Sequence, residues 1–470
     1  MELCIYRNGN QARIILIFFF IVFFCLLSSA PADGPASDKL LEILQRKGYL
    51  NKNEVAEVKE VLKNEKDKEI EVVYEEGLRL RRKDRGFDIR VGGLVQADMR
   101  LFDHNYPVEN EFDIRRARIL MEGRAFDYFQ YKLEAELEGS QHRRLVDGYV
   151  GFDYFPFLKL KAGQFKEPFS LEHLTVDKYI EFMERSMAYH LTPKRDVGFM
   201  VYGGLPGDAV GYAIGIFSGH GRDESGGDVG EDDKDVCARI TIRPFQWTGI
   251  GLLEGLHLGG SFAHAHIKTS DVDFGIETAG FTEFLRVTPR AKFYLILDVD
   301  DRRRFGWELA WGLGPLILKG EWIRTDYHNI ALTSGEEFDF FMKAWYVSGL
   351  VMLTGERLEI KRGVFTKIRP NRDFSLKEGG WGALGLAFRL EEFDADRVIY
   401  EHLVDEDYFV RGAEAYTFAL NWYLNSMVRV CVNFSHYDFS SPLYLGTDEK
   451  GRTMYVNDED IFAARFQVEF

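Results

Sequence analysis

The chain has 470 residues, of which 29% are charged and 14% are aromatic, and its formal net charge is −16. This share of charged residues excludes a bundle of membrane-spanning helices. Frequent Phe, Tyr and Gly, together with only 12 Pro, favour many strands and turns over a helical bundle.

The chain begins with a short apolar segment that has the features of an export signal. Residues 14–27 are continuously apolar, follow Arg7 and Arg13, and precede the small residues SSAPA. A run of 14 residues is short for a spanning helix, which needs about 20. We therefore predict a signal peptide over 1–30, with an N-terminal anchor helix as the competing interpretation. Only Cys237 and Cys431 follow it, so no disulfide framework is expected.

Residues 31–80 differ in sequence pattern from the rest of the chain. Apolar residues recur at helical spacing on both sides of Gly48, and Asn51 with Glu54 resembles a capping box. We predict a helical or linker segment in the periplasm. A solvated spacer and a coiled coil that supports a trimer are both compatible with this pattern.

A two-residue period begins at Phe87 and continues to the last residue, where ARFQVEF ends on Phe470. Such alternation is typical of strands with two different faces. Eighteen segments show it: 87–102, 116–126, 129–139, 146–155, 157–165, 197–203, 211–217, 237–245, 256–268, 284–296, 304–314, 315–327, 338–353, 357–365, 379–390, 412–424, 428–439 and 464–470.

The connections between these segments alternate in length. Residues 126–129, 312–315 and 424–427 are tight turns, whereas 219–235 and 391–411 are long and polar. Short turns at one end and long loops at the other are typical of an outer-membrane barrel. We therefore predict an all-β fold, a transmembrane antiparallel β-barrel over residues 86–470.

The two faces of the strands indicate what the barrel encloses. In 129–139 one face carries Tyr131, Leu133 and Leu137, and the other carries Lys132 and Glu134. The same contrast recurs in 116–126, 157–165 and 416–424. A soluble core would lose much free energy by burying so many charges, whereas a water-filled lumen keeps them hydrated and lipid contacts the apolar face. On this view the final strand closes the barrel, so its apolar side faces lipid as far as Phe470.

Three stretches resemble the phosphate-selective porin O and P family: EFDIRRARILMEGRAFDYFQYKLEAELEG, LVDGYVGFDYFPFLKLKAGQFKEPFSLEHLT and FMERSMAYHLTPKRDVGFMVYG. The resemblance is close in sequence over about residues 87–218, and from there to Phe470 it rests on the pattern of alternating residues alone. It implies sixteen strands, a homotrimer, assembly by the barrel-assembly machinery and passive diffusion of anions such as phosphate or polyphosphate. We adopt sixteen strands over the eighteen candidates, because long strands are easily split by inspection.

An anion-selective pore needs fixed cations where it narrows, and the resemblance implies an inward loop near 166–196. Arginine suits phosphate because its planar fork binds two oxygens and stays charged. The candidate pore-lining and anion-binding residues are Arg116, Arg118, Arg124, Lys132, Lys159, Lys161, Lys166, Lys178, Arg185, Lys194 and Arg195. Each of them could instead pair with a neighbouring carboxylate, and the FMERS motif could brace the loop.

The expected function is therefore an outer-membrane porin in a Gram-negative-type bacterium, with lipid and lipopolysaccharide around it. A plugged barrel that serves as a surface binding or structural protein, and an unselective general porin, are the alternatives. The acidic stretches 223–235 and 391–407 favour a solvated exterior and oppose anions at the pore mouth. No enzyme activity, cofactor or nucleic acid is expected. His264 and His266 share one strand face but lack a third ligand nearby, so no metal is expected.

Overall fold

The computed structural model describes residues 70–470 except 75, 83–85, 104–109, 140–143, 220, 222–233, 268–271, 292–293, 362 and 448–450, together with 46, 52, 53 and 56. The chain divides into two units, Met1–Glu69 and Ile70–Phe470, and the fold below is that of the second. The predicted signal peptide and most of the predicted helical or linker segment lie outside the described residues. No helix in the described ranges is long and apolar enough to cross a membrane.

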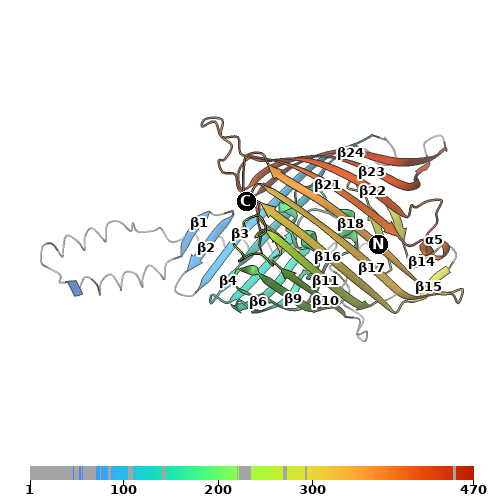
Figure 1. Cartoon of the computed structure of the whole chain (residues 1–470), viewed down its shortest axis with the longest axis horizontal. Helices are drawn as coiled ribbons and strands as arrows, with labels where there is room; N and C mark the ends of the chain where they lie inside the picture. The colour runs from blue at the N-terminus through green and yellow to red at the C-terminus, as the bar shows by residue number, and fades with distance from the viewer. Residues whose placement is uncertain are drawn as a thin grey trace, which may run out of the picture. The chain divides into compact units, whose positions relative to one another are not determined.

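Within the described residues, sixteen strands form a closed antiparallel barrel (Figure 1). Each wall strand pairs with its neighbours, and β24 pairs with β3 from Ile461↔Phe102 to Glu469↔Leu94, which closes the ring. The wall strands are β3 (Phe87–Phe102), β4 (Glu111–Ala125), β5 (Phe129–Glu136), β6 (Leu145–Phe155), β7 (Leu158–Lys166), β8 (Arg195–Gly204), β9 (Val210–Phe217), β10 (Asp235–Ile242), β11 (Leu256–His266), β16 (Asp301–Leu313), β17 (Leu316–Leu332), β18 (Glu337–Met352), β21 (Ala383–Ala395), β22 (Gly412–Tyr423), β23 (Val428–Thr447) and β24 (Thr453–Glu469).

The alternation in the sequence corresponds to the two faces of this wall. In β22 the outward side chains of Phe418 and Leu420 are 52% and 41% exposed, whereas Thr417, Ala419 and Asn421 face inward and are buried. The outer surface is therefore apolar and the inner surface is mixed, as predicted for a barrel in lipid.

Two of the eighteen periodic segments do not belong to the wall. Residues 284–296 contribute to β13 (Glu283–Val287), β14 (Arg290–Ala291) and β15 (Tyr294–Asp298), and 357–365 forms β19 (Ile360–Lys361) and β20 (Val364–Phe365). β13 pairs with β12 (Phe274–Glu277), and β19 pairs with β20. Sixteen strands was therefore the correct choice, but for a different reason. The segment 357–365 is a separate hairpin. The segment 284–296 is divided between the β12–β13 hairpin and the β14–β15 pair, of which β15 pairs with the end of β17 at Ile296↔Leu332.

Residues 71–82, at and just beyond the end of the region predicted as a helical or linker segment, contain a β-hairpin. β1 (Glu71–Tyr74) and β2 (Leu78–Arg82) pair with each other, and β2 pairs with β3 from Leu78↔Val91 to Arg82↔Phe87. The residues of β2 alternate between apolar and polar, and Gly77 at the turn has a φ of 129°, which suits glycine. The hairpin thus continues along the edge of β3 next to the residues that pair with β24.

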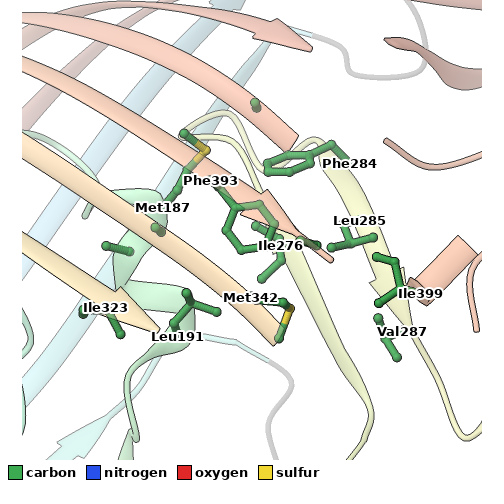
Figure 2. Close-up of a cluster of buried hydrophobic side chains, with 14 of the residues drawn as sticks. Met187, Leu191, Ile276, Phe284, Leu285, Val287, Ile323, Met342, Phe393 and Ile399 are labelled. Carbon is green, nitrogen blue, oxygen red and sulfur yellow. The ribbon is translucent and has the colours of Figure 1, made fainter. Parts of the chain in front are cut away.

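Part of the lumen is packed like the core of a soluble protein. The segment 167–194 enters it between β7 and β8 and carries α4 (Leu171–Leu174), η2 (Asp177–Tyr179) and η3 (Met187–Leu191). Figure 2 shows Met187 and Leu191 of this segment among Ile276, Met342 and Phe393. The remaining short helices are η4 (Pro206–Asp208) and α5 (Val398–His402).

Candidate functional site

The segment 167–194, called the inward loop below, is held inside the barrel by side chains of the opposite wall. Both carboxylate oxygens of Glu321 on β17 accept hydrogen bonds from the start of α4, from the backbone N–H of Leu171 at 2.9 Å and of Glu172 at 2.7 Å. Arg429 on β23 donates to the carbonyls of Ile180 at 2.7 Å and Glu181 at 3.1 Å. These bonds satisfy backbone groups that the wall would otherwise leave buried without partners.

The FMERS motif braces the inward loop. Glu184 forms ion pairs with Arg465 at 2.7 Å and Arg115 at 3.0 Å, while Arg185 pairs with Asp177 and donates to the carbonyl of Thr175 at 2.7 Å. Arg185 therefore fixes the loop to itself.

Asp177 collects three guanidinium groups at one point. It pairs with Arg185, with Arg118 at 2.7 Å and with Arg116 at 3.6 Å. Burial disfavours its charged form, but these arginines dominate and hold the pKa of Asp177 well below its usual range. Asp177 is therefore ionised and holds the guanidinium groups of the lumen wall in fixed positions.

A cavity of about 470 Å³, called the inner cavity, lies between the inward loop and the wall from β4 to β10, and the short-turn residues Pro156 and Gly203 to Asp208 contribute to its lining. Of the described residues, seven Lys or Arg and four Asp or Glu line it. The acidic side chains are Glu134, Asp147, Asp177 and Asp208. The basic side chains are Arg118, Lys132, Lys159, Lys161, Lys166, Arg195 and Arg239.

Most of the charge in the inner cavity is internally paired. Asp147 accepts from Lys132 at 2.6 Å and from Arg195 at 2.8 Å. Arg118 pairs with Glu136 at 2.7 Å, in addition to Asp177. Arg239 pairs with Glu308 on β16 at 2.5 Å. Such pairing keeps these groups ionised and positioned while it lowers their attraction for a passing ion.

Lys161 and Lys166 form no ion pair with any carboxylate of the described residues. Lys166 donates to the carbonyls of His173 at 2.5 Å and Thr175 at 3.0 Å, which anchors it to the inward loop. The Lys161 ammonium lies 4.4 Å from the ring centre of Tyr149 and 5.3 Å from that of Tyr202. Carbonyl dipoles and ring faces stabilise an ammonium without cancelling its charge, so these two lysines offer positive charge to a mobile anion.

A second cavity of about 320 Å³, called the outer cavity, lies on the long-loop side. Its basic lining consists of Lys194, Arg195, Arg302 and Arg304, together with His190. Arg195 lines both cavities. A solute that passes from one cavity to the other therefore meets Arg195.

The structure sorts the eleven basic residues singled out in the sequence. Six line the inner cavity (Arg118, Lys132, Lys159, Lys161, Lys166, Arg195), and Lys194 lines the outer cavity. The other four do not line either cavity. Arg124 pairs with Asp153 near the short turns, Lys178 pairs with Glu469, Arg116 donates to Gln96, and Arg185 braces the loop.

Three basic residues of the cavities were not singled out: Arg239, Arg302 and Arg304. The signal was present, since Arg239 alternates with apolar residues in CARITIRPF, and Arg302 and Arg304, two residues apart in DRRRF, share one face of a strand. These strands lie outside the region of close resemblance. His264 and His266 lie at the long-loop end of β11, where His264 is 3.1 Å from Asp301.

Comparison with known proteins agrees with this architecture. The profile of the family described as "Phosphate-selective porin O and P" matches residues 89–470. Porin O of Pseudomonas aeruginosa is 25% identical over 423 residues, which covers 84% of this chain and 91% of that protein. Among solved structures, an anion-selective porin from Comamonas acidovorans has a TM-score of 0.50 at 12% identity, covering 81% of this chain and 99% of that one. At this identity the last comparison supports the fold alone.

Proposed function

The chain belongs to the phosphate-selective porin O and P family and is an outer-membrane porin, and we propose that its lumen conducts small anions of the phosphate class. The path runs from the outer cavity past Arg195 and Lys166 into the inner cavity. The inward loop narrows this path, because it occupies the part of the lumen opposite β4 to β10. In this proposal the lumen side chains bind and release solute and catalyse nothing.

The observation that carries the proposal is the pair of lysines without a carboxylate partner, Lys161 and Lys166, in a cavity where basic residues outnumber acidic ones. At roughly 5 Å in water one such charge attracts a monovalent anion by about 0.8 kcal/mol, which raises its local concentration about fourfold. Conduction requires attraction of this modest size, since a tightly held ion would not leave.

We also propose that the porin is a homotrimer surrounded by lipid and lipopolysaccharide and inserted by the barrel-assembly machinery. The basis is the family resemblance. The acidic residues Asp405, Glu406 and Asp407 in the connection after β21 would then lie on the outside of the cell, where divalent cations can bridge them to lipopolysaccharide.

The test is a planar-bilayer recording on the purified mature protein under a KCl gradient. We expect conductance steps in groups of three and a reversal potential directed toward the chloride equilibrium value, with current lowered by millimolar phosphate. The variant Lys161→Gln should lower the chloride-to-potassium permeability ratio about fourfold. The matched control is Lys343→Gln, because Lys343 lies on the outward face of β18 and pairs with Asp394 at 3.3 Å.

Other outcomes would decide against the proposal in distinct ways. A reversal potential near zero, or one directed toward potassium, would leave a general porin without anion preference. The absence of conductance steps from folded protein would favour a barrel plugged by the inward loop and used for binding or structure.

A further inference from the structure

The inner cavity is lined by basic side chains and by apolar or aromatic side chains, and inorganic phosphate is attracted only by the basic ones. The basic residues supply charge, but Tyr149, Phe165, Met200 and Tyr202 also line the cavity. A fully hydrated inorganic anion gains nothing from apolar and aromatic surface. An organic body gains free energy in proportion to the apolar area that it removes from water.

The aromatic rings surround the lysine that lacks a carboxylate partner. The Lys161 ammonium lies 4.4, 5.2 and 5.3 Å from the ring centres of Tyr149, Phe165 and Tyr202, which come from β6, β7 and β8. The side chain of Phe165 is 2% exposed and packs against Tyr149 and Phe217 at 6.0 and 5.5 Å, so this part of the wall is ordered. Charge and apolar surface are thus presented together at one place.

The size of the inner cavity fits a small organic molecule. Its volume of about 470 Å³ falls within the range of roughly 300–1,000 Å³ typical of small-molecule sites. The inward loop adds further apolar surface through Leu174 and Val176. Sites of this kind combine a mostly apolar wall with a few polar groups that fix orientation.

We propose that the inner cavity is a binding subsite for organic anions that carry an aromatic or alkyl body on a phosphate group, and that such monoesters are preferred over inorganic phosphate. The phosphate contacts Lys161, and the body lies against Met200 and Tyr202. This inference rests on the proposed anion path and names the class of solute that binds best within it.

The experiment compares two probes with the same head group, inorganic phosphate and phenyl phosphate, as blockers of the chloride current in planar bilayers. We expect phenyl phosphate to block at a concentration about tenfold lower, because only it has a ring to bury. Tyr202→Ser should bring the ratio of the two half-blocking concentrations toward one, and Tyr202→Phe should retain it. The matched control is Tyr416→Ser on the outward face of β22, where the ratio should stay at the wild-type value.

The outcomes separate this inference from the proposed function. If the channel is chloride-directed and phosphate blocks it, but phenyl phosphate blocks no better, the organic-anion subsite is wrong and the anion path stands. Equal loss of the ratio in Tyr202→Ser and Tyr416→Ser would also overturn the subsite. If the current is directed toward potassium and neither probe blocks, both proposals fail together.

Discussion

The contact between Glu321 and the start of α4 gives the sharpest test of how the inward loop is held. The carboxylate accepts the backbone N–H groups of Leu171 and Glu172 and the hydroxyl of Tyr346 at 2.7 Å, and all four residues are buried. Replacement Glu321→Ala leaves two backbone donors without an acceptor, at about 2 kcal/mol each. Together these add about 4 kcal/mol in favour of local opening, which is on the order of a 10³-fold increase in the open population.

The effect should be confined to the beginning of the inward loop, because Arg429 and Glu184 anchor later residues independently. Glu321→Gln keeps one oxygen as an acceptor, so we expect about 2 kcal/mol and roughly a 30-fold increase. The assay is hydrogen exchange by mass spectrometry on the full chain in detergent micelles, with peptides over 168–176 compared with peptides from β17. Glu414→Ala, which removes an exposed carboxylate from β22, is the control.

The result that would refute this reasoning is a folded Glu321→Ala protein in which residues 170–176 exchange as slowly as in the wild type. The same conclusion would follow if Glu321→Gln and Glu321→Ala accelerated exchange equally. In either case the loop would be held by the packing of its apolar side chains and not by this carboxylate.

Two further predictions concern charge inside the barrel. Asp147→Asn removes the carboxylate that Lys132 and Arg195 share, while Lys132 keeps its ion pair with Glu134 at 2.7 Å. The chloride-to-potassium permeability ratio from the reversal potential should rise about fourfold, and an unchanged or lower ratio would argue against a role for these cations. The second prediction concerns His173, which is 1% exposed and whose ring nitrogens have no hydrogen-bond partner among the described residues. Burial, together with the nearby charges of Lys166 and Lys194, lowers the pKa of His173 well below 6.5. The stability that the neutral imidazole contributes is present above pH 6.5 and is lost as the pH falls below it, so hydrogen exchange of residues 170–176, corrected for intrinsic rate, should accelerate from pH 7.5 to 5.5. His173→Phe should abolish this pH dependence. If the dependence persists in that variant, His173 is not the group that causes it.

The barrel wall could be predicted from the sequence because its signal is local. Alternation within β5 or β22 reports directly which side chains face lipid and which face the lumen, and the connection lengths report the two ends. The same signal misled at 284–296 and 357–365. A hairpin packed inside a lumen also has one buried face, so period two alone does not distinguish it from a wall strand.

The candidate site was harder to predict because ion pairing depends on contacts between distant parts of the chain. Lys132 and Lys161 are equivalent in the sequence, each an inward lysine on a strand of alternating charge. The structure separates them, because Lys132 forms an ion pair with Asp147 while aromatic rings surround Lys161. Likewise Arg239 acquires its partner from Glu308, 69 residues later. No local pattern predicts such pairs.

The packed part of the lumen and the part that contains the inner cavity should respond differently to substitution, which matters for engineering the channel. Facing β17, β18, β21 and β22, side chains such as Phe182, Leu350 and Phe393 fill the barrel interior, and truncating one of them creates a void at a cost of about 3–5 kcal/mol without adding a route for solute. Truncating a side chain of β4 to β10 that lines the inner cavity, such as Tyr202, enlarges that cavity instead. A wider or re-tuned channel should therefore be sought by substitution on one half of the circumference, while the other half sets how much destabilisation the protein tolerates.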